Sequence, residues 1–191
     1  MQGPKRALLT LAVLGATVGP LLDGLHTHSG ATWYPHPQLW LAEWWVVPLF
    51  CGAAVAIGGG RLLTERFLPT RAPTPRQAAL SMALFVVGYA LSGFWPIGEL
   101  PMATLLLAFF AVSWAATDRS ALGLAAAALT GLGGWLVEHT LVHAGFFFHR
   151  DPGRAGVALG IPPLYFCAAS ALGTLAKQLA GQDPKLKPTT S

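Results

Sequence analysis

Long apolar stretches separated by short polar segments recur along the whole chain. A membrane span needs about 20 mostly apolar residues, and six stretches approach or exceed that length. They cover residues 7–25, 41–60, 77–94, 101–116, 120–143 and 160–180. Little chain is left outside them, so the pattern predicts an all-α integral membrane protein. We expect a six-transmembrane-helix bundle that forms a single domain over residues 1–191.

The second apolar stretch begins with a pair of tryptophans. Trp44 and Trp45 stand directly before Val46, Val47 and Pro48. Trp prefers the lipid headgroup layer, where its ring is in an apolar environment and its N–H can reach a polar partner. Pro48 falls in the opening turns of the expected helix, where a missing N–H costs least. This order of residues is typical of a helix that enters a membrane.

Composition and charge agree with that pattern. The 191 residues are 53% hydrophobic and only 10% charged, whereas an average soluble domain is roughly a quarter charged. Membrane topology and attraction to anionic lipid heads account for the formal net charge of +4. The charge therefore does not indicate nucleic-acid binding.

The basic residues predict an orientation, because Lys and Arg in short loops stay on the cytoplasmic side. Ten of the 12 fall on one side of the expected spans, and Arg150 and Arg154 fall on the other. Both termini are therefore predicted to face the cytoplasm. In an alternative interpretation, Lys5, Arg6 and the apolar run after them form a secretory signal, but the cleavage site is weak.

Small residues repeat along the fifth stretch. Gly123, Ala127 and Gly131 lie four apart on one helical face, and Gly133 and Gly134 follow. Helices in lipid approach one another closely where side chains are small. The repeat predicts that the fifth helix is central and contacts two or more neighbours. A cavity for a ligand is the alternative use of the same residues.

A carboxylate and two histidines share the end of the fifth stretch. Glu138 precedes His139, and His143 follows four residues later, at a spacing found in metal sites. The favoured interpretation is a set of interfacial histidines, some hydrogen-bonded to Glu138 or Asp23, with no metal. The alternative is a membrane metalloenzyme such as a lipid hydroxylase. The expected topology places all six histidines on the non-cytoplasmic side: His26, His28, His36, His139, His143 and His149.

Other catalytic patterns fail on inspection. An intramembrane serine protease needs Gly-x-Ser-Gly, whereas Leu91 stands directly before Ser92 in GYALSG. The sequence has no phosphate-binding glycine loop. Cys51 and Cys167 lie in apolar stretches and are predicted to be reduced core residues. A small transporter stays as an alternative, although the charges lie near the membrane faces.

Three stretches of the chain carry a family pattern. They read WWVVPLFCGAAVAIGG, SWAATDRSALGLA and IPPLYFCAASALGTLAKQLAG, in that order. From Trp44 onward the chain resembles the insulin-induced gene (INSIG) family of small six-span membrane proteins. The turn Asp118-Arg119-Ser120 is the most distinctive element of the match. The first span and the loop after it match poorly.

The resemblance implies a regulator rather than an enzyme. Eukaryotic INSIG proteins hold an oxysterol in the membrane and bind the sterol-sensing segments of Scap and of HMG-CoA reductase. The family's Asp in this turn matters for partner association, which makes Asp118 the candidate partner contact. A plain N-cap of the fifth helix is the alternative role for Asp118. The departures from the eukaryotic pattern, with few lysines, suggest a GC-rich bacterium.

We therefore expect a non-enzymatic, prokaryotic-type INSIG-like protein of the bacterial inner membrane. It would hold a diacylglycerol-like or sterol-like lipid in a central cavity, without a cofactor or metal. A membrane-protein partner and a homo-oligomer are its expected associations. A His-metal lipid-modifying enzyme and a small transporter are the alternatives. The cavity is expected between the first, fifth and sixth spans, with these candidate residues: Gly131, Gly134, Glu138, His139, Ala168 and Ala169.

Overall fold

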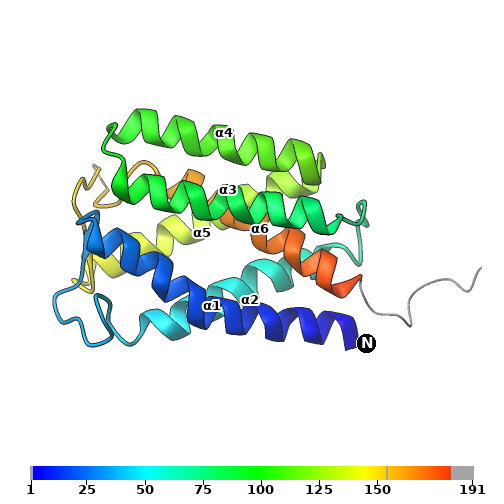
Figure 1. The fold of residues 1–191 in the computed structure, drawn as a ribbon, viewed down its shortest axis with the longest axis horizontal. Helices are drawn as coiled ribbons and strands as arrows, with labels where there is room; N and C mark the ends of the chain where they lie inside the picture. The colour runs from blue at the N-terminus through cyan, green and yellow to red at the C-terminus, as the bar shows by residue number, and fades with distance from the viewer. Residues whose placement is uncertain (1, 154, 182–191) are drawn as a thin grey trace, which may run out of the picture.

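The computed structural model describes residues 2–153 and 155–181. This part of the chain forms six α-helices and one two-stranded antiparallel sheet (Figure 1). The elements are α1 (Gln2–His28), β1 (Thr32–Trp33), α2 (Val46–Thr64), α3 (Pro75–Phe94), α4 (Glu99–Thr117), α5 (Ala121–His143), β2 (Phe148–His149) and α6 (Ile161–Ala180).

Five of these helices, α1 to α5, are long and apolar enough to cross a membrane. The predicted all-α membrane fold is therefore confirmed, and the count of six spans is supported for five helices. The second span begins later than expected, at Val46 rather than residue 41. Trp44 and Trp45 precede α2, and Pro48 lies in its first turn, as the sequence predicts.

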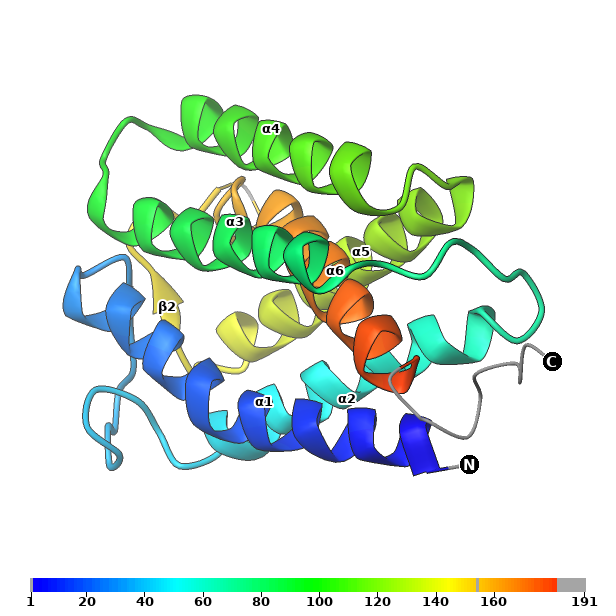
Figure 2. The same cartoon turned by 45° about the vertical axis from the view of Figure 1, so that its right-hand side comes forward.

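The centre of the bundle is α6, which packs against all five other helices (Figure 2). Its buried positions are mostly small, which lets neighbouring backbones approach closely. A helix enclosed by protein needs few bulky apolar side chains, since it presents little surface to lipid. This enclosure accounts for α6 being the one described helix that is not among the five apolar enough to cross a membrane by themselves. Cys51 and Cys167 are both free thiols; Cys167 is a buried core residue as predicted, whereas Cys51 is only partly buried.

The prediction that the fifth helix is central is wrong. Among the described helices, α5 packs closely against α6 alone. Its small residues serve that single contact: the rings of Phe166 and Tyr165 occupy the space where Gly131 and Gly134 would carry a Cβ. The opposite face of α5 carries exposed leucines such as Leu129 and is suited to lipid. Small residues show that one neighbour approaches closely, but they do not give the number of neighbours.

Local sequence signals set the start of α3. Thr74 and Gln77 form a reciprocal capping box, and Pro75 occupies the first helical position. The Gln77 side-chain amide also donates to the Ala116 carbonyl at 2.6 Å. This bond joins the start of α3 to the end of α4. The same end of the bundle holds Arg61, Asp118 and Lys177.

Candidate functional site

Two buried polar clusters lie toward opposite ends of α6. The first, which we call the α2–α6 cluster, consists of Arg61, Glu65, Thr70, Asp118 and Lys177. The second, the α1–α5 cluster, consists of Asp23, Tyr34, Glu138, His149 and Tyr165. Tyr165 of the second cluster and Lys177 of the first both lie on α6. Because a helix rises about 1.5 Å per residue, the two clusters are well separated along this helix.

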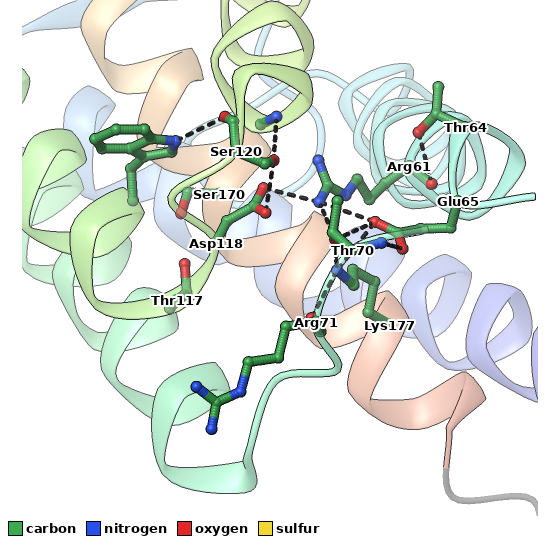
Figure 3. A network of polar contacts seen from close by, with 12 residues as sticks. Arg61, Thr64, Glu65, Thr70, Arg71, Thr117, Asp118, Ser120, Ser170 and Lys177 are labelled. Carbon is green, nitrogen blue, oxygen red and sulfur yellow. Dashed lines mark hydrogen bonds and ion pairs between the residues drawn. The ribbon is translucent and has the colours of Figure 1, made fainter. Parts of the chain in front are cut away.

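The α2–α6 cluster is organised around a buried arginine (Figure 3). Arg61 Nη2 lies 2.8 Å from Asp118 Oδ2 and 2.9 Å from Glu65 Oε1, and it donates to Thr70 Oγ1 at 3.0 Å. Lys177 Nζ lies 3.0 Å from the same Glu65 oxygen. These contacts join α2, α6, the loop after α2 and the turn between α4 and α5.

Every charge in the α2–α6 cluster has an opposite partner. Burial raises the pKa of Glu65, but hydrogen bonds from the Thr70 backbone N–H and hydroxyl and from Lys177 outweigh it, so the pKa lies below 4.5. Lys177 also donates to the Thr70 hydroxyl and to the Arg71 carbonyl, while the Arg71 guanidinium points away from the cluster (Figure 3). Two cations balance two carboxylates, which is the arrangement of a structural ion-pair network.

The Asp-Arg-Ser turn feeds directly into this cluster. Asp118 Oδ1 accepts from the Ser120 hydroxyl at 2.7 Å, and the Ser120 oxygen accepts from the Gly123 N–H at 3.0 Å. Ser120 is therefore the N-cap of α5, and the alternative that gave this role to Asp118 is wrong. Asp118 instead ends α4 and pairs with Arg61. Its contact with a partner protein stays a prediction.

The α1–α5 cluster begins with a buried carboxylate and phenol. The Tyr34 hydroxyl donates to Asp23 Oδ2 at 2.8 Å. Burial, reinforced by the Asp23 carboxylate, raises the pKa of Tyr34 well above its ordinary value. The phenol therefore stays protonated and remains a donor. On the other side of the cluster, the Tyr165 hydroxyl interacts with the Glu138 carboxylate.

A second pair in the α1–α5 cluster is incompletely satisfied. Glu138 Oε2 lies 3.0 Å from His149 Nε2, close enough for an ion pair. Neither atom makes a well-directed hydrogen bond in the part of the chain that the structure describes, and both are buried. Buried polar atoms almost always have hydrogen-bond partners. This pair is therefore a candidate contact for a ligand or a bound water.

Two cavities accompany the clusters. The larger, about 650 Å³ including its open part, reaches His149 and has walls from α1, α3, α4 and α6. The smaller, about 390 Å³, adjoins Arg61 and Asp118 and includes Ala169. Residues of both polar and apolar character line the larger cavity, among them His26, Thr32, Ser92, Met102, His149 and Leu164.

A serine and a histidine in the larger cavity resemble a nucleophile and its base. His26 Nε2 lies 2.9 Å from Ser92 Oγ, but it also lies 3.0 Å from the Tyr89 carbonyl oxygen. A carbonyl oxygen can only accept, so Nε2 carries the hydrogen and cannot take a proton from Ser92. The Ser92 hydroxyl itself donates to Tyr89. This serine is not activated for nucleophilic attack.

The structure brings only some of the predicted lipid-pocket residues together. Gly134 and Glu138 both meet Tyr165 of the α1–α5 cluster, whereas Gly131 faces the ring of Phe166. His139 packs beside Trp135 and hydrogen-bonds the Ala155 carbonyl. Ala168 and Ala169 are buried on α6, and only Ala169 lines a cavity, the smaller one.

Sequence reasoning missed the central residue of the α2–α6 cluster and the tyrosines of the α1–α5 cluster. Arg61 had a detectable signal, because it is a charge within the helix formed by an otherwise apolar stretch, and such charges are usually paired or functional. Tyr34 and Tyr165 had none, since a tyrosine at a membrane boundary is ordinary.

The fold and its two polar clusters define a small multi-pass membrane protein built around a buried central helix. The chain is similar to the mycobacterial Insig homologue MvINS from Mycobacterium vanbaalenii, with a TM-score of 0.83, 27% identity and coverage of 95% of this chain and 97% of that chain. A cross-linked trimer of MvINS carrying an arginine-to-cysteine substitution matches with a TM-score of 0.84 and the same identity and coverage. No protein-family model and no curated protein matches the chain. The resemblance found in the sequence is confirmed: over nearly its whole length the chain is similar to a prokaryotic Insig homologue.

Proposed function

We propose that the protein is a non-enzymatic regulator that holds a membrane lipid within its helix bundle. The observation that carries the proposal is the Glu138–His149 pair, two buried polar atoms without a directed hydrogen bond among the described residues. A single lipid hydroxyl can donate to the Glu138 carboxylate and accept from the His149 ring. It would satisfy both atoms at once.

The chemistry of the α1–α5 cluster favours an uncharged head. The cluster contains two carboxylates, Asp23 and Glu138, and no Lys or Arg. A phosphate head would meet like charge there, and like charges in a poorly solvated site repel strongly. Diacylglycerol-like and sterol-like lipids each offer a hydroxyl and no charge. We therefore propose a neutral, hydroxyl-bearing lipid as the ligand.

Lipid analysis of the purified protein tests this proposal. The full chain is extracted in mild detergent, and bound lipid is measured by native mass spectrometry and solvent extraction. We expect about one neutral lipid per chain, and much less in Glu138→Gln, because a hydrogen bond to a charged group contributes about 1.5–3 kcal/mol. Thr104→Ala, which removes an exposed hydroxyl that donates to the Leu100 carbonyl within α4, should keep its lipid. Absence of neutral lipid from the wild type, or equal loading of all three proteins, contradicts the proposal.

We also propose that both termini face the cytoplasm of a bacterial inner membrane and that α6 is the sixth span. Ten of the 12 basic residues support this orientation, although Arg154, Lys185 and Lys187 lie outside the described residues. A C-terminal fluorescent fusion should be bright, and a C-terminal alkaline phosphatase fusion inactive. The reverse pair of results would invert the topology.

Association with other chains is part of the same proposal. MvINS has been crystallised as a cross-linked trimer, so we propose a homo-oligomer for this chain, measurable by its mass in detergent. Asp118 is our candidate contact for a membrane-protein partner. Its carboxylate is held by Arg61 and Ser120, so that contact requires the ion pair to open.

No resident cofactor or metal is needed for this function. We expect His139→Ala combined with His143→Ala to leave the protein folded and loaded with lipid. Elemental analysis of the protein as purified should find no stoichiometric iron or zinc. About one tightly held metal per chain, lost in that double variant, would favour the His-metal enzyme instead.

A further inference from the structure

Two histidines stand side by side in the last two turns of α5. The ring centroids of His139 and His143 are 4.0 Å apart. His139 Nδ1 lies 2.9 Å from the Ala155 carbonyl oxygen, and His143 Nδ1 lies 2.8 Å from the carbonyl oxygen of His139. Each ring therefore uses its Nδ1 in a hydrogen bond to a backbone carbonyl.

These bonds determine the tautomer of each neutral ring. A carbonyl oxygen has no hydrogen to give, so each Nδ1 must be the donor and carry the hydrogen. In a neutral imidazole the other nitrogen then has a free lone pair. Both Nε2 atoms are consequently in the form that binds metal ions. A backbone carbonyl on the remote nitrogen is also the usual support for a metal-binding histidine.

Neighbouring groups hold both rings in place. Trp135 stacks on the His139 ring, with centroids 5.1 Å apart and planes at 17°. Gly156, at φ +77°, brings the backbone against His143: a Cβ at that position would lie 3.2 Å from Cε1 of the ring. The two rings are therefore ordered by contacts from α5 and from the loop before α6, although His143 is exposed.

We propose that His139 Nε2 and His143 Nε2 form an exchangeable site for a divalent transition-metal ion. In residues 2–153 and 155–181 no group of three or more His, Cys, Asp or Glu side chains could hold a metal. The site thus offers two protein ligands, and water completes the coordination. Imidazole nitrogen suits Zn²⁺, Ni²⁺ and Cu²⁺, and Cu²⁺ binds most tightly in that series. The site is independent of the proposed lipid function.

Metal binding at this site has a structural consequence. A metal on Nε2 draws electron density from the ring and makes Nδ1–H a stronger donor. The bond from His139 to Ala155 should tighten, and with it the attachment of residues 155–160 to α5. Amide exchange in residues 155–159 therefore reports on the occupied site separately from affinity.

The test uses the full chain in detergent, purified without a histidine tag. Cu²⁺ alone is titrated calorimetrically at neutral pH into the wild type, His139→Ala and His143→Ala. The matched control is His28→Ala, which removes an exposed histidine from the end of α1. Electron paramagnetic resonance of the copper counts the ring nitrogens bound to it.

Each α5 variant removes a ligand, so we expect it to lower Cu²⁺ affinity by more than the roughly tenfold that loss of an outer-shell partner costs, and we expect the control to match the wild type. Two ring nitrogens should be seen in the wild type and fewer in either α5 variant. Cu²⁺ should slow amide exchange in residues 155–159 of the wild type but not of His143→Ala. Wild-type affinity in both α5 variants, or an equal loss in the control, overturns the proposal. If His139→Ala without metal unfolds at a lower temperature than the wild type, the number of ring nitrogens bound to copper in His143→Ala alone decides the test.

Discussion

The two buried polar clusters each contain two carboxylates but differ in the partners of those carboxylates and in how completely their polar atoms are satisfied. In the α2–α6 cluster, Arg61 alone reaches Asp118, Glu65 and Thr70 within 3.0 Å. In the α1–α5 cluster, Glu138 Oε2 and His149 Nε2 are close but lack directed hydrogen bonds in the described chain. A satisfied buried network stabilises a fold, whereas unsatisfied buried atoms leave bonding capacity for a ligand.

The positions of the clusters fit that difference. The α2–α6 cluster joins segments that are far apart in sequence, namely the ends of α2 and α4, the α2–α3 loop and the end of α6 (Figure 3). The α1–α5 cluster borders the larger cavity through His149. We therefore expect substitutions in the first cluster to lower stability and substitutions in the second to change ligand content.

The largest effect is expected from Arg61→Met. The change takes Arg61 away from the partly buried Asp118 carboxylate and leaves Glu65 with Lys177, and breaking a buried pair in this way costs about 3–5 kcal/mol. Thermal unfolding in detergent measures the loss. Arg66→Met changes an exposed position on the same side, and its free energy of unfolding should stay within about 0.5 kcal/mol of the wild-type value. Glu138→Gln should cost far less than Arg61→Met, and equal losses would remove the distinction between the clusters.

A smaller effect is expected from Gly134→Leu. A side chain there would meet the ring of Tyr165, and overpacking typically costs about 1–3 kcal/mol. Gly133→Leu is the matched control, because its Cβ would meet nothing within 4 Å. Melting temperature and bound lipid are measured together. An unchanged melting temperature with lipid lost from Gly134→Leu alone would show that lipid, rather than the ring, fills this space.

Removing the N-cap of α5 should have a moderate effect. Ser120→Ala deletes the acceptor of the Gly123 N–H and the donor to Asp118, and such a change costs about 1 kcal/mol. Thr140→Ala is the control, since its exposed hydroxyl bonds only within α5. Chemical denaturation in mixed micelles compares the two. A loss as large as that of Arg61→Met would mean that the turn, and not Arg61, organises the α2–α6 cluster.

Lowering the pH tests the α2–α6 cluster with little change in the shape of its side chains. The pKa of Glu65 is lowered below 4.5 by its Thr70 and Lys177 hydrogen bonds, despite burial. The stabilisation that the ionised Glu65 carboxylate contributes is therefore fully present above pH 4.5. It is lost as the pH falls through the pKa of Glu65 in the folded protein. Melting curves should show a smaller loss of stability below pH 4.5 for Glu65→Gln than for the wild type. Parallel curves would exclude Glu65 as a source of acid sensitivity.

Much of the architecture follows from the sequence alone. Every backbone group in lipid must be hydrogen-bonded within the protein, which leaves helices and closed barrels, and apolar stretches of about 20 residues have the length of a spanning helix. The start of α3 is equally local, because Thr74, Pro75 and Gln77 carry its capping signals. The INSIG resemblance also depended on residues near one another in the chain, such as the Asp118-Arg119-Ser120 turn.

The tertiary structure decided which helix is central and which polar groups meet. Gly131 and Gly134 indicated close packing of α5. The helix with five neighbours is nevertheless α6, because α6 carries small buried residues on several of its faces. Asp118 looked like a cap, but the fold places Arg61 against it and leaves the cap to Ser120. Hydropathy and capping depend on residues within a turn or two of one another. Ion pairs and cavities depend on how separate helices pack, and no local pattern records that arrangement.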